Sequence, residues 1–259
     1  MGLLEGKVAV LSGVGPGLGR SLGQLLAEAG ADLVLAARTE SRLEKAAAVV
    51  REIGQRALVV PTDITDEAAC QNLVDRSLEE FGRVDVLVNN AFAIPPMEPL
   101  TESNFDRIRD SHETNVLAPL RLTTMFAPSL AASKGSVVMI NSAVIRHSRV
   151  EFGAYKLAKA ALLHLASSLA TELGPRGIRV NSVAPGWIYE NVQKAYFDFL
   201  ASERRITHQE VYDEIASATD LKRLPTPEEV ANVVVFLASD LASGVTGQCL
   251  DVNCGEFHS

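Results

Sequence analysis

The sequence has few of the residues that mark secreted, membrane-spanning or nucleic-acid-binding proteins. It contains three cysteines among its 259 residues. Cys70, Cys249 and Cys254 form no C-x-x-C pair, so we expect reduced thiols in a cytoplasmic protein and no metal site. No apolar run reaches the ~18 residues of a membrane span, and the N-terminus reads as a short lead into a first strand, not as a signal peptide. With a net charge of −8, the chain also lacks the basic excess that attracts nucleic acid.

What the sequence does have is a regular alternation of apolar strands and helical segments, with 47% hydrophobic residues to build a core. This alternation predicts an α/β fold, a doubly wound, Rossmann-like parallel sheet with helices on both faces. Because no linker, repeat or low-complexity segment interrupts it, we expect a single domain over residues 1–259. The last helix should begin at Thr226, with Glu229 completing a capping box. The predicted strands are 7–12, 32–37, 56–61, 84–91, 135–142, 178–186 and 248–253, and the predicted helices are 18–29, 40–53, 66–81, 102–130, 152–173 and 226–239.

A glycine-rich turn joins the first strand to the first helix. Gly13 and Gly17 fall between the strand and the helical pattern that starts at Leu18, and Gly19 is the second residue of that pattern. Bare backbone N–H groups at a helix N-terminus suit a phosphate, so this context predicts a dinucleotide site. The strict G-x-G-x-x-G spacing is not met, and a simple tight turn is the alternative.

The end of the second predicted strand bears on the choice of cofactor. Arg38 follows Ala37 there, and no carboxylate stands at the strand tip. In dinucleotide folds an acidic residue at this place binds the 2′-hydroxyl of NAD, whereas an arginine accommodates the 2′-phosphate of NADP. The sequence therefore favours NADP(H) over NAD(H), unless Arg38 is only a solvated residue at the start of a helix. Further polar or small residues end other strands: Asp63, Asn89, Ser142, Pro185 and Gly186.

One helix carries a tyrosine and a lysine that could act together. Tyr155 and Lys159 are four residues apart, so they share a helix face. The pKa of a tyrosine is ordinarily about 10, and a nearby cation favours the phenolate and lowers that pKa. The pair is therefore a candidate acid/base device at neutral pH. The alternative is a half-buried tyrosine beside a solvated lysine.

The alternating pattern breaks between residues 187 and 224. This stretch is rich in aromatic residues and predicts one or two short helices over a cleft, which would form a substrate lid. A contact between subunits is the alternative. The aromatic residues are Trp187, Tyr189, Tyr196, Phe197, Phe199 and Tyr212.

Taken together, these residues resemble the classical short-chain dehydrogenase/reductase family over essentially the whole chain. The turn `SGVGPGLG`, `NNA` at 89–91, Asn115, Ser142, `YKLAK` at 155–159 and `PG` at 185–186 follow the family's order and spacing. The resemblance implies that Tyr155 is the acid or base, that Lys159 lowers its pKa and holds the nicotinamide ribose, and that Ser142 polarises the substrate oxygen. It implies that Asn115 positions a water leading to Lys159. The implied cofactor contacts are Gly13, Gly17, Leu18, Gly19, Arg38, Asp63, Ile64, Asn89, Ala91, Tyr155, Lys159, Pro185, Gly186 and Ile188.

Three residues depart from the family pattern. Phe92 stands where a glycine is usual, so a bulky ring should lie near the cofactor or the substrate. Glu190 stands where a threonine is common, and we expect it to point away because a carboxylate would repel a pyrophosphate. Cys254 replaces a glycine near the C-terminus.

The leading functional hypothesis is an NAD(P)-dependent oxidoreductase, with NADP(H) favoured, that acts on a ketone or secondary alcohol. The aromatic stretch and Phe92 suggest a bulky, mostly apolar substrate. One alternative is a 3-oxoacyl-carrier-protein reductase, whose acidic partner could meet Arg146, Arg149, Arg204 and Arg205. Another is a catalytically silent dinucleotide-binding regulator. The resemblance also implies a homotetramer that uses the helix of Tyr155 and the long helix before it.

Overall fold

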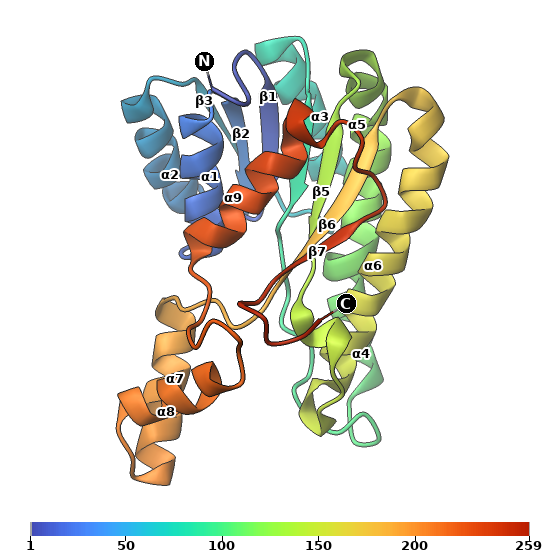
Figure 1. The fold of residues 1–259 in the computed structure, drawn as a ribbon. Helices are drawn as coiled ribbons and strands as arrows, with labels where there is room; N and C mark the ends of the chain where they lie inside the picture. Colours follow the sequence, from blue (N-terminus) through green and yellow to red (C-terminus); the bar gives the residue numbers. More distant parts are fainter. Residues whose placement is uncertain (1, 259) are drawn as a thin grey trace.

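A computed structural model describes residues 2–258 of the protein. Within this range the strands form one parallel sheet of seven, in the order β3-β2-β1-β4-β5-β6-β7. Figure 1 shows the sheet between two layers of helices. The strands are β1 (Val8–Ser12), β2 (Asp32–Ala37), β3 (Ala57–Pro61), β4 (Val86–Asn89), β5 (Ser136–Ile140), β6 (Arg179–Pro185) and β7 (Cys249–Val252).

Two groups of helices cover the two faces of the sheet, and each group combines helices from distant parts of the sequence. One core lies between the sheet and α1, α2 and α9, and the other lies between the sheet and α3, α5 and α6. Successive strand residues alternate between them: Ala9 and Leu11 belong to the first core, and Val8 and Val10 to the second. These helices are α1 (Leu18–Glu28), α2 (Glu40–Ile53), α3 (Glu67–Phe81), α5 (Ala118–Ser133), α6 (Gly153–Leu173) and α9 (Pro227–Ala238).

The strand order brings the chemically interesting residues to one edge of the sheet. The chain runs outward from β1 to β2 and β3, and then returns to place β4 on the other side of β1. Ser12 of β1 is in register with Ala36 of β2 and Asn89 of β4. Parallel strands therefore end together at a topological switch point, which is where open α/β sheets bind ligands.

Most predicted elements are present, and the differences have local causes. The helix predicted for 102–130 is interrupted: α4 (Phe105–His112) and α5 are joined by a π-helical turn over Glu113–Leu117 that contains Asn115. The fifth strand ends at Ile140, two residues before Ser142, because Ser142 caps a short 3₁₀ helix and its Oγ accepts from the Val144 N–H. The predicted capping box of Thr226 and Glu229 at α9 is confirmed.

The stretch from 187 to 224 folds into two helices, α7 (Asn191–Arg204) and α8 (His208–Ser217), which project beyond the helical layers in Figure 1. They have a small core of their own, in which Phe197 and Val211 are fully buried. Tyr189 closes this core, with its ring centroid 4.8 Å from that of Tyr212. The segment is therefore a separately packed unit beside the carboxyl ends of the strands.

All three cysteines are free thiols. Within residues 2–258, no helix combines the length and apolar character needed to cross a membrane. Over the same residues, no three histidine, cysteine, aspartate or glutamate side chains gather in an arrangement that could hold a metal ion.

Candidate active site

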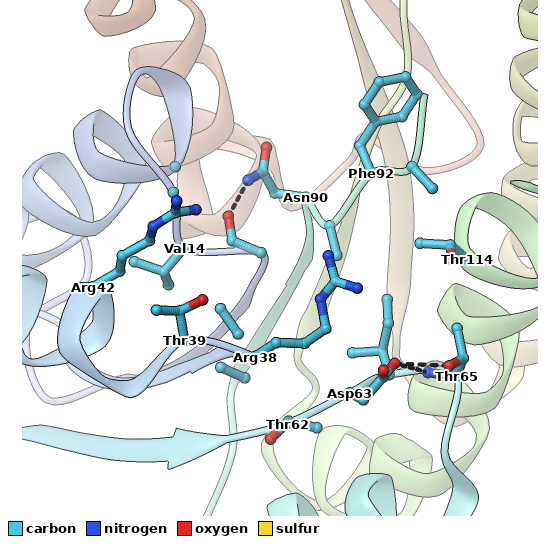
Figure 2. Close-up of a pocket in the computed structure, with 18 of the residues that line it drawn as sticks. Val14, Arg38, Thr39, Arg42, Thr62, Asp63, Thr65, Asn90, Phe92 and Thr114 are labelled. Atoms are coloured by element: carbon cyan, nitrogen blue, oxygen red, sulfur yellow. Dashed lines mark hydrogen bonds between the residues drawn. The ribbon is translucent and has the colours of Figure 1, made fainter. Parts of the chain in front are cut away.

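A cavity of about 680 Å³ opens at the switch point, beyond the carboxyl ends of β1, β2 and β4. Its volume lies within the range of about 300–1,000 Å³ that is usual for small-molecule sites. Figure 2 shows the side chains that converge on it from the glycine turn, the end of β2, the end of β3 and the loop after β4. Of the predicted cofactor residues, those that line this cavity are Gly13, Leu18, Gly19, Arg38, Asp63, Ile64 and Ala91.

Two glycines of the turn, Gly13 and Gly19, have no room for a side chain. Gly13 has φ +90°, and a Cβ there would lie 2.3 Å from the backbone nitrogen of Ala91. A Cβ on Gly19 would lie 2.6 Å from the carbonyl oxygen of Gly13. The glycines therefore allow the turn to lie against the loop after β4 while the N-terminus of α1 faces the cavity, as a phosphate-binding turn requires.

The expectation that Glu190 points away from the glycine turn is wrong. Its side chain does not point away; its Oε2 accepts a hydrogen bond of 2.9 Å from the backbone N–H of Leu18, at the start of α1. A Cβ on Gly17 would overlap this carboxylate, so the missing side chain of Gly17 makes the space that Glu190 fills. Burial raises the pKa of Glu190, and the Leu18 N–H opposes that rise. The partial positive charge of the helix N-terminus explains the contact, because it attracts a protein carboxylate as it would a phosphate.

The end of the cavity near β2 is basic. Arg38 follows β2, and Arg42 follows one helical turn later in α2; both side chains are exposed and line the cavity (Figure 2). Asp63, which follows β3, also lines the cavity, and its Oδ1 accepts from the Thr65 N–H at 3.0 Å and the Thr65 hydroxyl at 2.7 Å. These bonds, with a smaller contribution from Arg38, lower the pKa of Asp63. Arg42 was not predicted, although its spacing of four from Arg38 was a usable signal.

The two asparagines at the end of β4, Asn89 and Asn90, differ in where their side chains lie. The side chain of Asn89 is buried beneath the cavity, where its Nδ2 lies 3.3 Å from the Met139 sulfur. Asn90, which was not predicted as a site residue, lines the cavity and donates a 2.6 Å hydrogen bond to the carbonyl of Gly13 (Figure 2). Asn90 therefore fixes the glycine turn, and the structure does not bring the Asn89 side chain to the cavity.

A smaller cavity of about 170 Å³ contains the predicted catalytic pair of hydroxyl groups. Ser142 and Tyr155 both line it, as do Pro185 and Gly186 from the end of β6. Burial raises the pKa of Tyr155 above its ordinary value, while the Ser142 hydroxyl acts in the opposite direction. Tyr155 is therefore a neutral phenol at neutral pH in this structure.

Lys159 lies deeper than Tyr155, with 4% of its surface exposed. Its Nζ donates a 2.8 Å hydrogen bond to the carbonyl of Ile140, at the end of β5. Burial lowers the pKa of Lys159 to about 7. Burial and the Ser142 hydroxyl act on the pKa of Tyr155 in this structure. The lowering of that pKa by Lys159 stays a prediction.

Phe92 links the two cavities. It lines the larger one, and its ring centroid is 5.3 Å from that of Tyr155 in the smaller one. The Lys159 Nζ lies 5.1 Å from the same ring centroid. The Phe92 ring therefore lies beside the predicted catalytic residues Tyr155 and Lys159, and its closeness to the cofactor or the substrate stays a prediction.

Two further predicted residues face protein, not an open cavity. The buried Asn115 uses its amide on the loop after β4: Nδ2 donates to the Ala93 carbonyl at 2.8 Å, and Oδ1 accepts from the Ala93 N–H at 3.1 Å. Ile188 packs against the core beside α1. Asn115 therefore anchors the loop that carries Phe92.

Comparison with known proteins places this geometry in a family. The family model described as enoyl-(acyl carrier protein) reductase matches residues 13–256. A short-chain dehydrogenase/reductase from Aspergillus oryzae is 34% identical, with 97% of this chain and 95% of the relative covered. The chain belongs to the short-chain dehydrogenase/reductase family. The 7alpha-hydroxysteroid dehydrogenase of Escherichia coli K12, another member, is 31% identical over 97% of this chain and 94% of its own.

A solved structure also has the same fold as this chain. L-Sorbose reductase from Gluconobacter frateurii, in complex with NADPH and L-sorbose, superposes with a TM-score of 0.92 at 31% identity, covering 100% of this chain and 99% of the other. The residues of this chain fit a nicotinamide dinucleotide, because two glycines that have no room for a Cβ atom, a helix N-terminus and a basic end lie in one cavity. The Glu190 carboxylate is bonded to the first backbone N–H of α1, a group that could otherwise bind a phosphate.

Proposed function

We propose that this protein is an NADP(H)-dependent oxidoreductase that interconverts a ketone and a secondary alcohol. The observation that carries the proposal is the pairing of Ser142 and Tyr155 in one cavity, beside a larger cavity built around a glycine turn. Membership of a family whose named relatives are dehydrogenases and reductases supports the same reaction class.

In this reaction the nicotinamide supplies or takes up the hydride. The residues of the chain handle the proton. In the reductive direction, the neutral Tyr155 hydroxyl donates its proton to the carbonyl oxygen, and the Ser142 hydroxyl donates a hydrogen bond to that oxygen. In the oxidative direction, the phenolate of Tyr155 accepts the proton. Lys159, with a pKa of about 7, can gain or lose its own proton near neutral pH and so adjust the charge beside Tyr155.

The preference for NADP(H) is supported by charge. Arg38 and Arg42 both line the β2 end of the cavity, where a 2′-phosphate would lie, and the strand ends in Ala37 with no carboxylate. Two guanidinium groups suit a phosphate dianion. Solved relatives are complexes with NADH, NAD or NADPH, so the family alone does not set this preference.

We further propose that residues 187–224 act as a substrate lid. Trp187 and Gln193 of this segment line the smaller cavity, while the segment packs on a core of its own. Phe152, Trp187 and Phe257 give that cavity an apolar wall, which supports an apolar substrate body. The bulk of the substrate and the cytoplasmic location stay predictions.

The carrier-protein alternative is less well supported. Three of its four candidate arginines are in ion pairs: Arg146 with Asp251, Arg149 with Glu256 and Arg204 with Glu214. They form no free basic patch for an acidic carrier.

Enoyl reduction, which the matching family description names, is disfavoured by the four-residue spacing of Tyr155 and Lys159, because the resemblance implies a wider spacing in enoyl reductases. Turnover of any ketone would exclude the silent regulator.

The homotetramer is also a proposal. Phe105, Leu117 and Leu157 lie on α4, the π-helical turn and α6, and each exposes between 47% and 71% of its surface. These are the elements that the family resemblance places between subunits. Size-exclusion chromatography with light scattering measures this, and a monomer would contradict it.

Replacement of Tyr155 tests the function. Tyr155→Phe should reduce ketone turnover with NADPH at least a thousandfold, because it removes the proton donor, while the dissociation constant for NADPH stays within about twofold. Tyr196→Phe removes a hydroxyl from the exposed lid and should leave turnover unchanged. Retained turnover in Tyr155→Phe would overturn the role given to Tyr155.

A further inference from the structure

The smaller cavity contains polar side chains that the proposed reaction does not use. Ser142 and Tyr155 belong to the reacting end. His147, Gln193 and Glu256 line the same cavity and come from three separate parts of the chain: the segment after β5, helix α7 and the C-terminal tail. None of them is part of the family pattern recognised in the sequence.

Two of these side chains hold buried atoms that no protein group satisfies. In the part of the chain that the structure describes, Nδ1 of His147 and Oε1 of Gln193 are buried and have no hydrogen-bond partner. The His147 ring lies against Phe152 and Phe257, with centroid distances of 5.7 and 5.3 Å. Burial and the nearby Arg149 and Lys156 lower the pKa of His147, which keeps the imidazole neutral. Because unpaired buried polar atoms cost free energy, these two are candidates for partners supplied by a ligand.

Glu256 adds a third polar group. Its side chain is 7% exposed, and Oε1 lies 3.5 Å from the Nη2 of Arg149, at the edge of the cavity. Burial raises the pKa of Glu256, with Arg149 opposing that rise. A carboxylate held here by an arginine still has lone pairs that face the cavity, and these accept hydrogen bonds from a hydroxyl group.

We propose that His147, Gln193 and Glu256 form a second polar subsite, which selects substrates bearing a hydroxyl group in addition to the carbonyl or carbinol that reacts. The inference rests on the proposed function, because it specifies the substrate class of the same site. A hydroxyl can donate to the Gln193 Oε1 or the Glu256 carboxylate and can pair with the His147 Nδ1. The rings of Phe152 and Phe257 contact the apolar carbons between the two oxygens.

The volume sets the size of that substrate. The cavity measures about 170 Å³, and a protein cavity of about 150 Å³ takes up a benzene-sized ligand. A six-membered ring or a short hydroxyketone therefore fits this structure better than the bulky substrate expected from the sequence.

Paired compounds test the subsite. Trp187 is the only tryptophan of the chain and lines the cavity, so its fluorescence reports binding without turnover. Titrations in the absence of cofactor would compare trans-1,4-cyclohexanediol with cyclohexanol on the wild type, Gln193→Leu, His147→Phe and Glu256→Gln. Gln71→Leu, an exposed change on α3, is the matched control.

The wild type and Gln71→Leu should bind the diol about tenfold more tightly than the monool, which is the effect of one or two hydrogen bonds. Gln193→Leu or His147→Phe should reduce that ratio to about one without weakening cyclohexanol binding. Equal binding of the two alcohols by the wild type, or a ratio that survives every substitution, would overturn the subsite. Reduction of 4-hydroxycyclohexanone by NADPH tests the proposed function separately: its failure with an intact diol preference would refute the reaction and leave the subsite.

Discussion

The position of Glu190 makes a prediction about cofactor affinity. Its carboxylate accepts from the first backbone N–H of α1 and fills the space above Gly17. A dinucleotide whose pyrophosphate uses this helix N-terminus must displace it. We therefore expect Glu190→Thr and Glu190→Gln to bind NADPH more tightly than the wild type does.

The size of the effect follows from the contact. A hydrogen bond to a charged group contributes roughly 1.5–3 kcal/mol net, and the lower end applies because Glu190 is only half-buried. If NADPH no longer has to break a contact that stabilises the free protein by about 1.5 kcal/mol, its dissociation constant should decrease about tenfold. The same substitutions should lower the melting temperature of the cofactor-free protein by a few degrees, because they remove the only side chain that caps α1 within residues 2–258.

Fluorescence titration of NADPH measures the affinity. Glu67→Gln, an exposed acidic residue in the first turn of α3, is the control for net charge and should bind NADPH as the wild type does. Because burial raises the pKa of Glu190, the carboxylate becomes protonated at a higher pH than usual, and the difference between the wild type and Glu190→Gln should shrink as the pH is lowered. Equal affinities of the wild type and both variants at pH 7.5 would refute the competition.

Two further predictions concern charged groups in the same site. The pKa of Lys159 is lowered from 10.5 to about 7 in the folded protein, so the unfolded chain binds more protons between these values and the free energy of unfolding rises with pH there. Lys159→Met should remove this rise, which amounts to at most about 5 kcal/mol, and urea unfolding of both proteins at pH 7 and pH 10 measures the difference. Arg38→Ala should weaken NADPH binding about tenfold and leave NADH binding unchanged, whereas Arg76→Ala, on the surface of α3, should change neither; an NADPH preference that survives Arg38→Ala would show that Arg38 does not read the 2′-phosphate.

The fold could be predicted because hydrophobic periodicity is a local property. The strand at 32–37 and the helix at 40–53 were predicted to the residue, since both have clear apolar patterns and polar boundaries. The end of β5 was not, because the hydroxyl of Ser142 bonds to the Val144 N–H and turns the chain into a 3₁₀ helix. The π-helical turn at Asn115 was missed as well: its amide bonds to Ala93, more than twenty residues away.

The sequence was enough to predict which strand ends meet at the candidate site. It was not enough to predict which side chains at those strand ends face the cavity. Asn89 and Asn90 are adjacent and chemically identical, and the pleat of β4 alone directs the first into the sheet. His147 and Gln193 carry no signal in the sequence, since an isolated histidine or glutamine is usually a surface residue. Only the approach of α7 and the C-terminal tail to the segment after β5 brings them into one cavity with Glu256.

The direction of the Glu190 side chain could not be predicted from charge without knowing which group lies nearest to its carboxylate. The expectation that it points away compared its carboxylate with a bound pyrophosphate, and like charges repel. In the structure, its nearest partner is the N-terminus of α1, which attracts any anion. The same backbone N–H groups that make the turn a phosphate site thus make it a site for a carboxylate of the chain itself. Because Glu190 immediately precedes α7, release of this contact by a cofactor would also free the start of α7, which carries Gln193 to the substrate cavity. Cofactor affinity and substrate selection are therefore expected to change together in Glu190 variants.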